Sequence, residues 1–182
     1  MNNKRNLILL LLLVCLQLFV PAKMIYDHEA ILNKGKVFKF KTAPVDPSDP
    51  IRGKYITLQF EANRFYTTRN AAWYSNQEVF ATLGEDKDGF AKIANVSTSK
   101  PESADYIKTN IDYYQNSDSA YIVLNFPFTK FYMEESKAAP AEKAYIDAAR
   151  DTTSVAYAKV SVLNGSGVIS NVFIKDIPLV NK

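Results

Sequence analysis

The sequence predicts an α+β protein, predominantly antiparallel β with one short internal helix, preceded by a long N-terminal transmembrane and juxtamembrane helix. Three observations favour this class. A long apolar run lies near the N-terminus, as in membrane-spanning and signal segments. Several later segments alternate apolar and polar residues between turn-forming residues, which is typical of half-buried strands. Tyrosine and phenylalanine, which are frequent in strands, each occur 11 times in 182 residues.

The N-terminal segment consists of a basic pair followed by the apolar run. Lys4-Arg5 precedes Leu7–Val20, which is apolar except for Gln17. A membrane-spanning helix needs about 20 mostly apolar residues and the core of a signal peptide only about 7–15, so the run falls between the two. The apolar pattern continues at helical spacing through Met24–Leu32. We therefore predict one continuous helix over Arg5–Asn33.

This helix predicts the topology and the domain organisation of the chain. Residues 1–33 would form a signal anchor, and residues 34–182 are long enough for one β-rich domain with its own core. Because Lys and Arg beside a span stay in the cytoplasm, we expect a single-pass protein of the cytoplasmic (inner) membrane with an extracytoplasmic C-terminal domain. The alternative is cleavage after Ala22, which would release a soluble periplasmic ligand-binding protein.

Composition and the rarest residue types exclude several functional classes. The chain has 22 Lys and Arg against 19 Asp and Glu, and this balance gives no basic surface for nucleic acid. Cys15 is the only cysteine and lies in the apolar run, so the domain has neither a disulfide nor a thiol nucleophile. His28 is the only histidine. We therefore expect no zinc site, no catalytic triad and no cofactor.

The first part of the domain has two strand-like segments on either side of a proline-rich loop. Lys36–Thr42 places Phe38 and Phe40 on one face, as expected for a strand. Ala43–Pro50 contains three prolines, which fix φ and predict a rigid, extended loop. Tyr55–Ala62 has the cleanest alternation of apolar and polar residues in the chain, so we predict a strand over its whole length.

The second part of the domain is expected to contain hairpins and one helix. Turn-forming residues separate the segments that would pair. Pro140–Arg150 is the expected internal helix, because proline suits a first turn and its alanines share a face with Tyr145. The expected hairpins pair Glu78–Gly84 with Phe90–Thr98, Tyr106–Tyr114 with Ala120–Phe126, and Ser154–Leu163 with Val168–Lys175.

Two short blocks carry a resemblance to a known family. The first, Gly53–Phe60, follows the proline-rich loop, and the second, Lys130–Glu134, precedes the expected helix. Together they resemble the bacterial family named for its motif Gly-Asp-Tyr-x-x-Leu-x-Tyr, the GDYXXLXY protein family. The motif is matched by Gly53, Tyr55 and Leu58, while Phe60 replaces its last tyrosine and Lys54 its aspartate.

The resemblance implies a small membrane-anchored protein, often linked to multi-pass membrane proteins, without an established activity. Because Lys54 replaces the aspartate, no catalytic or metal-binding role of that aspartate transfers to this chain. The two blocks and the preceding loop are therefore candidates for an interaction surface. If the blocks meet in space, Arg52 would pair with Glu134 beneath Tyr55. The candidate residues are Asp46, Asp49, Arg52, Gly53, Tyr55, Leu58, Tyr132 and Glu134.

The main functional hypothesis is a membrane-anchored extracytoplasmic interaction module that works with an integral, multi-pass membrane protein. The proline-rich loop favours it, because prolines reduce the entropy that a loop loses when it is ordered on binding. The alternative is a carboxylate-dependent envelope hydrolase, with Asp46 and Glu134 as acid and base. The sequence marks no catalytic residues, so we expect binding without enzymatic activity, and it identifies no small-molecule ligand.

Overall fold

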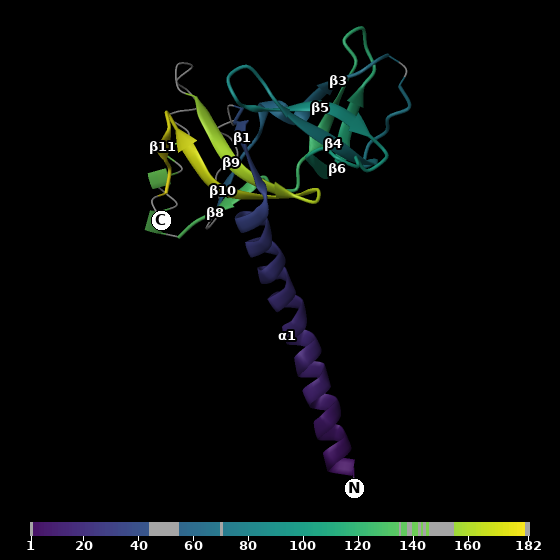
Figure 1. Ribbon diagram of the computed structural model, residues 1–182, viewed down its shortest axis with the longest axis vertical. Helices are drawn as coiled ribbons and strands as arrows, with labels where there is room; N and C mark the ends of the chain where they lie inside the picture. Colours follow the sequence, from purple (N-terminus) through teal and green to yellow (C-terminus); the bar gives the residue numbers. More distant parts are fainter. Residues whose placement is uncertain are drawn as a thin grey trace.

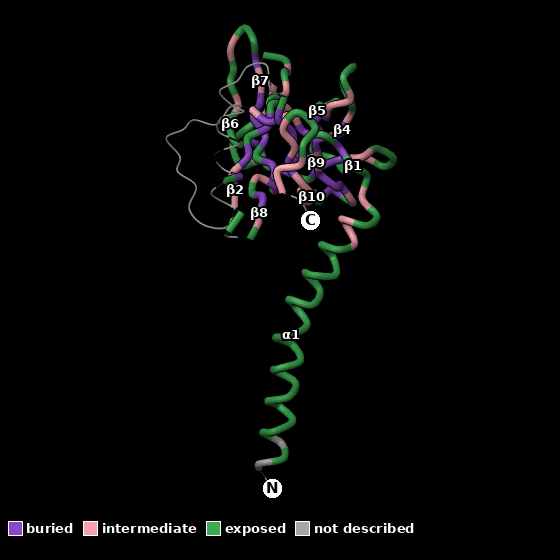
Figure 2. Tube along the Cα trace, turned by 90° about the vertical axis from the view of Figure 1, so that its left-hand side faces the viewer, coloured by how far each residue is buried: buried purple, intermediate pink, exposed green. Residues whose placement is uncertain are grey.

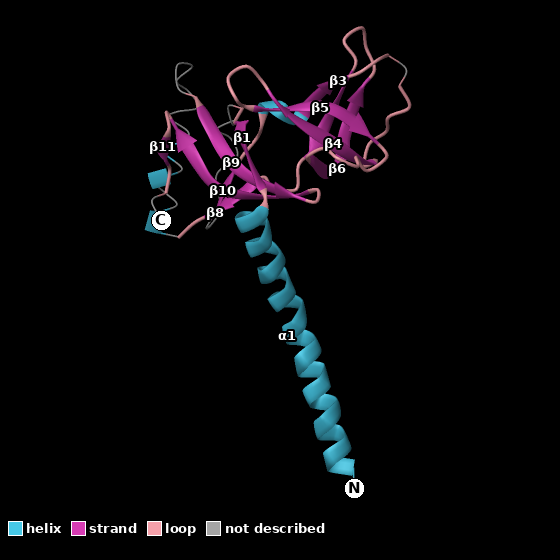
Figure 3. Ribbon diagram, viewed as in Figure 1, coloured by secondary structure: helices cyan, strands magenta, loops and turns pink. Residues whose placement is uncertain are grey.

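The computed structural model describes residues 2–43, 55–69, 71–134 and 155–180, together with residues 136, 137, 140, 141, 143 and 145. These residues form one long helix that carries a β-rich domain at its C-terminal end (Figure 1). Figure 3 separates the helical stalk from the strands above it. The predicted α+β class, with mostly antiparallel β structure after a long N-terminal helix, is confirmed.

The stalk is the helix α1 (Asn2–Lys34), which contains Pro21 and confirms the continuous helix predicted over Arg5–Asn33. Its large apolar side chains from Leu7 to Tyr26 are exposed, and Figure 2 shows no part of the domain covering them. A helix that is apolar on all sides requires burial in protein or in lipid. The segment Asn6–Lys34 is long and apolar enough to cross a membrane, so α1 has the properties of a membrane anchor or of a signal sequence.

The junction between α1 and the domain is short. The amide of Gly35 donates to the Ile31 carbonyl at 2.9 Å, and the first strand begins at Lys36. The last turns of α1 pack against two strands of the domain, Ala156–Leu163 and Ser166–Ile174. The helix and the domain are therefore connected without a loop that would let them move independently.

The strands of the domain form three antiparallel sheets. A four-stranded sheet has the order β1-β9-β10-β11, a two-stranded sheet pairs β2 with β8, and a five-stranded sheet has the order β3-β7-β6-β4-β5. The strands are β1 (Lys36–Lys41), β2 (Tyr55–Thr57), β3 (Arg64–Tyr66), β4 (Glu78–Glu85), β5 (Ala91–Ser97), β6 (Tyr106–Gln115), β7 (Tyr121–Asn125), β8 (Lys130–Tyr132), β9 (Ala156–Leu163), β10 (Ser166–Ile174) and β11 (Ile177–Pro178).

The three predicted hairpins are confirmed as the pairs β4–β5, β6–β7 and β9–β10. In the first turn the Asp86 carboxylate accepts the amides of Asp88 and Phe90 at 2.9 and 2.8 Å. In the last turn Asn164 and Gly165 have φ values of 51° and 85°. Positive φ at two consecutive residues is the signature of a tight hairpin turn, which explains the Asn-Gly pair at this position.

The strand predicted over Tyr55–Ala62 is wrong in its second half. Regular pairing ends at Thr57, and a short 3₁₀ helix, η1 (Glu61–Asn63), follows. The reason is a change of partner. The amide of Leu58 still bonds to the Thr129 carbonyl beyond β8, at 2.7 Å, whereas Phe60 forms a bridge with Thr42 at the end of β1. The predicted inward face was nevertheless correct for Ile56, Leu58 and Phe60, which are all buried.

Three short strands were not predicted, and the internal helix expected over Pro140–Arg150 is described only in part. The missed strands β3, β8 and β11 each have two or three residues, too few for an alternating pattern to stand out. Ser136 and Lys137 are already helical, before Pro140, where the helix was expected to begin. Ala141 and Tyr145 are helical and buried, as predicted from their shared face.

The hydrophobic core joins all three sheets. Phe40 of β1 lies edge-on to Phe60, Phe126 and Phe128, with ring centroids 5.5, 5.7 and 5.4 Å away. Phe126 and Phe128 stack on each other at 5.4 Å. Phe60 follows β2, and Phe126 and Phe128 lie in the connection from β7 to β8. The phenylalanine cluster therefore fills the seam between the five-stranded sheet and the rest of the domain.

Candidate functional site

The structure brings the two motif blocks together. β2 and β8 pair antiparallel, with Tyr55 opposite Tyr132 and Thr57 opposite Lys130. The two tyrosine rings lie 5.3 Å apart, and the Lys130 ammonium lies 4.8 Å from the centre of the Tyr55 ring. Tyr132 is 66% exposed. One face of this strand pair therefore presents two aromatic rings and a cation at the surface of the domain.

The opposite face of the same strand pair belongs to the core. Ile56, Leu58 and Phe131 are buried, and Leu58 is fully so. The candidate residue Leu58 thus supports the tyrosine face from below, because a fully buried side chain cannot reach a partner on the surface. Its place in the motif is explained by packing.

Several candidate residues lie outside the described part of the chain. Asp46, Asp49, Arg52 and Gly53 belong to this group, and so does the ion pair predicted between Arg52 and Glu134. Glu134 itself is described: its carboxylate pairs with the Lys137 ammonium at 3.1 Å, at the start of the helical segment.

A groove lies between α1 and the strand pair, and we call it the helix-side groove. It has a volume of about 430 Å³. The strand β8 lies at the end of the domain from which α1 leaves (Figures 1 and 2). The lining is mainly apolar and aromatic, and Lys130 supplies the one ammonium among the lining residues that the structure describes. It comprises His28 and Leu32 of α1, Pro127, Phe128, Lys130, Phe131 and Tyr132, and Gly167, Val168, Ile169 and Ser170 of β10.

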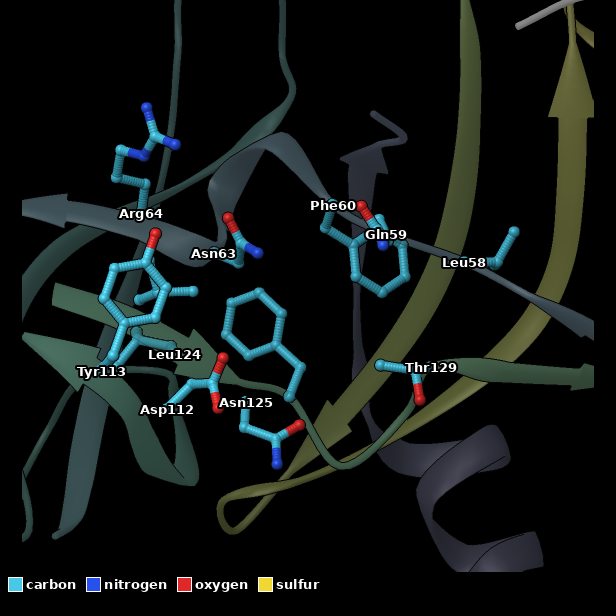
Figure 4. A pocket seen from close by; sticks show the side chains of 12 residues that line it. Leu58, Gln59, Phe60, Asn63, Arg64, Asp112, Tyr113, Leu124, Asn125 and Thr129 are labelled. Atoms are coloured by element: carbon cyan, nitrogen blue, oxygen red, sulfur yellow. The ribbon is translucent and has the colours of Figure 1, made fainter. Parts of the chain in front are cut away.

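A second cavity of about 380 Å³ lies at the seam beside the five-stranded sheet, and we call it the seam pocket (Figure 4). Its deeper wall consists of buried apolar residues such as Phe126 and Leu124. Polar side chains from separate elements surround its opening. They are Gln59, Asn63 of η1, Arg64 of β3, Asp112 and Tyr113 of β6, Asn125 of β7, and Thr129.

A β-bulge in β6 shapes one side of the seam pocket. Ile111 pairs with Leu124 and Tyr113 pairs with Val123, so Asp112 has no partner in β7. Adjacent residues of a regular strand point to opposite faces, whereas a bulge redirects a side chain. As a result, Asp112 and Tyr113 both line the pocket, and Figure 4 shows them side by side.

Within the described part of the chain, three polar side chains of the seam pocket have no hydrogen-bond partner and could bond a ligand. Among the residues that the structure describes, none donates to or accepts from the side chains of Asn63, Asp112 and Asn125. The backbone that carries them is nevertheless held in place. The Thr109 hydroxyl donates to the Asn125 carbonyl at 2.7 Å, and the Asn63 amide donates to the Phe60 carbonyl at 3.2 Å.

A cluster of tyrosines adjoins the seam pocket on the outer face of the sheet. The Arg64 guanidinium lies 4.5 Å from the centre of the Tyr121 ring. Tyr121 of β7 in turn contacts Tyr66 of β3 and Tyr113 of β6, the two neighbouring strands. The Tyr66 hydroxyl raises the pKa of Arg64, and the hydrogen bond between the hydroxyls of Tyr121 and Tyr113, 3.5 Å apart, raises the pKa of Tyr113. The cluster therefore places three phenol rings around one guanidinium.

Sequence reasoning missed the seam pocket. Its polar residues come from the segments on both sides of Phe60, from Thr129, and from the two strands predicted over Tyr106–Tyr114 and Ala120–Phe126. One signal was present: Asp112, Tyr113 and Tyr114 break the alternation that ends at Ile111, and such a break is how a bulge appears in a sequence. Metal-ligating side chains do not gather in groups of three or more within the described ranges.

Comparisons with known proteins give one match. No curated protein and no solved structure matches the chain significantly. The model of the GDYXXLXY protein family matches residues 17–172, which include the last part of α1 and every strand from β1 to β9. The β2–β8 pair built by the two motif blocks lies inside this match, and the chain therefore belongs to the GDYXXLXY protein family.

Proposed function

We propose that this protein is a single-pass, membrane-anchored interaction module of the cytoplasmic membrane, with its β domain outside the cytoplasm. Its partner is an integral membrane protein that binds the helix-side groove and the Tyr55–Tyr132 pair. The observation that carries the proposal is the position of the groove, which the last turns of α1 and the motif strand β8 line together.

The length of α1 sets the height of the groove above a bilayer. A hydrocarbon core about 30 Å thick needs about 20 helical residues, so a span that begins after Arg5 ends near Ile25. With a rise of about 1.5 Å per residue, His28 lies about 5 Å farther out, at the level of the lipid headgroups. The groove then opens where the loops and helix ends of another membrane protein emerge from the bilayer.

The chemistry of the groove favours a protein over lipid headgroups. Recognition of anionic lipids uses clusters of about 4–8 Lys or Arg, whereas Lys130 is the one such residue among the described residues of the lining and already lies over the Tyr55 ring. Exposed tyrosines beside an apolar groove are typical of the centre of protein interfaces. Tyr132 has the exposure and position of such an anchor residue.

The short junction at Gly35 also supports docking in the plane of the membrane. Because the domain follows α1 without a flexible linker, its groove keeps a fixed height and tilt relative to the helix. Confinement of both proteins to one bilayer raises their effective concentration. A moderate interface is then sufficient for a stable complex.

Pull-down of the full-length protein in a mild detergent tests the proposal. Wild type is compared with Tyr132→Ala and with Tyr74→Ala, a matched control because Tyr74 is 64% exposed and does not line the groove. We expect an integral membrane protein to co-purify with wild type and Tyr74→Ala and to be lost from Tyr132→Ala. Equal recovery with both variants, or recovery of lipid alone, would contradict the proposal.

The mass of the mature protein tests the membrane anchor separately. α1 continues through Ala22 without a break, and the groove needs His28 and Leu32 on the same helix. We therefore expect the intact N-terminal segment in the membrane fraction. A mature protein that begins after Ala22 and appears in the soluble fraction would support a released periplasmic protein instead.

A further inference from the structure

The seam pocket has no part in the proposed docking surface. No residue of α1 lines it, and its polar residues come from η1, β3, β6 and β7, from the segment that follows β2 and from the residue that precedes β8. Its volume of about 380 Å³ lies in the range of about 300–1,000 Å³ that is typical of small-molecule sites. Side chains without a protein partner and an apolar inner wall are also features of such sites.

The hydrogen-bonding groups of the pocket fit a neutral ligand rich in hydroxyl groups. The amides of Asn63 and Asn125 each offer donors and an acceptor, and the Asp112 carboxylate accepts only. A sugar hydroxyl both donates and accepts, so it can bond to an amide and a carboxylate at once. Bonds to a carboxylate are stronger than bonds between neutral groups, which makes Asp112 the expected main contact.

The apolar surface near these groups fits the ring of a sugar. The aromatic side chain of Phe126 lines the pocket together with Asn63 and Asn125, and Figure 4 shows these two amides on the polar side of the cavity. One face of a pyranose ring carries mainly C–H bonds and packs on an aromatic ring, while its hydroxyl groups point outward to polar side chains. Polar groups around an aromatic wall therefore suit a carbohydrate better than a uniformly apolar ligand.

The tyrosine cluster extends this site beyond one sugar. Tyr66, Tyr113 and Tyr121 lie on three adjacent strands with ring centroids about 6 Å apart between neighbours, and Tyr113 also lines the pocket. Such a row of rings offers successive stacking positions along a chain of sugars. Flat sheet faces with aromatic rings also stack the bases of single-stranded nucleic acid, but those sites add a groove of cations along the backbone. Here Arg64 is accompanied by the acid Asp112.

We propose that the seam pocket and the tyrosine cluster bind an oligosaccharide, with the Asp112 carboxylate accepting from a sugar hydroxyl and the tyrosines stacking on the following rings. The binding is not hydrolytic. Glycosidases ordinarily use two carboxylates, and Asp112 is the one carboxylate among the described residues that line this pocket.

The experiment uses the full-length protein in lipid nanodiscs, because maltoside detergents carry a sugar that would compete. Binding is measured by calorimetry for a β-1,4-linked N-acetylglucosamine tetramer and on a panel of immobilised glycans, with oligothymidine as the competing ligand class. Variants are Asp112→Asn, Asn63→Ala and Tyr66→Ala. Glu102→Gln serves as the matched loss of an exposed carboxylate outside the pocket.

We expect wild type to bind the tetramer or at least one glycan of the panel, and Glu102→Gln to bind equally well. Asp112→Asn weakens this binding about tenfold, the effect of losing about 1.4 kcal/mol. Tyr66→Ala weakens a tetramer more than a disaccharide, and Asn63→Ala checks the pocket without touching the bulge. The proposal would be overturned if wild type bound no glycan or preferred oligothymidine. It would also be overturned if the Asp112→Asn and Asn63→Ala variants bound glycan as tightly as wild type.

Discussion

The helix-side groove and the seam pocket share one wall but differ in chemistry. The connection from β7 to β8 contributes Phe126 and Thr129 to the seam pocket, and Pro127 and Phe128 to the groove. The groove is lined mainly by aliphatic and aromatic side chains, whereas amides, a carboxylate and a guanidinium surround the pocket. A fold of this size thus presents a surface suited to a protein and a cavity suited to a polar ligand on two sides of one segment.

Because the two sites differ in this way, they can be separated experimentally. The residues that would bind a partner, such as Tyr132, project from the surface, and so do Asp112 and Asn125 around the pocket. The residues that hold both sites in place are buried between them. Changes at the shared wall should therefore disturb both sites, and changes at exposed positions only one.

The largest effect is expected from Phe128→Ala. The Phe128 ring is buried, lies edge-on to Phe40 and stacks on Phe126, so its loss leaves a cavity that costs about 3–5 kcal/mol of the free energy of unfolding. Urea denaturation followed by near-ultraviolet circular dichroism measures this loss. Binding at both sites should weaken together. A loss below about 1 kcal/mol, no more than that of an ordinary surface change, would show that the two sites have no common structural wall.

Gly167→Ala should have a smaller effect of the same kind. A Cβ atom at Gly167 would lie 2.5 Å from the Phe128 ring and 3.2 Å from a methyl group of Val160. Forcing a buried ring to move typically costs about 1–3 kcal/mol. The same denaturation experiment should give this loss. Gly89→Ala is the comparison variant, because a Cβ at this position meets no atom within 4 Å while φ is 78°. It therefore adds backbone strain without crowding.

A crossed pair of variants tests the independence of the sites. Tyr132→Ala should lose the membrane partner and keep glycan binding, whereas Asp112→Asn should lose about tenfold in glycan affinity, about 1.4 kcal/mol, and keep the partner. Both positions are exposed, so neither variant should change the free energy of unfolding by more than about 0.5 kcal/mol. Loss of both activities in either variant would mean that the two sites are coupled.

The last effect concerns the alkaline limit of stability. Burial and the hydrogen bond to Asp176, at 2.7 Å, raise the pKa of Tyr157 to about 12. An unfolded tyrosine has a pKa of about 10, so the native state favours the protonated phenol. This contribution is complete below pH 10 and is lost as the pH rises through 12. Tyr157→Phe should therefore lose less stability between pH 9 and pH 12 than wild type, and equal slopes would contradict this role.

Most of the fold could be predicted from the sequence because its signals are local. The apolar run of α1 continues at helical spacing through Leu32, and the turns at Asp86–Gly89 and Asn164–Gly165 have the residue types that tight turns require. Each long hairpin follows from two alternating segments around such a turn. These features depend on neighbours in the sequence, so a single chain is sufficient to read them.

The parts that were missed depend on distant contacts. The strand at Tyr55 ends early because Phe60 bridges to Thr42, and β3 forms only because it pairs with β7. The bulge at Asp112 is defined by the register against β7, which the sequence of β6 alone does not contain. Tyr55 and Tyr132 were both named from the motif blocks, but their proximity to α1 follows from the packing of β10 between β8 and the helix.

Site-specific photo-cross-linking in cells tests directly whether the helix-side groove binds an integral membrane protein. A photoreactive amino acid replaces Tyr132 in the groove or, as the control, Tyr74 at an equally exposed site outside it. We expect one cross-linked product with an integral membrane protein from position 132 and none from position 74. Cross-links from position 132 to lipid only, or the same products from both positions, would contradict the assignment of this face as a docking surface.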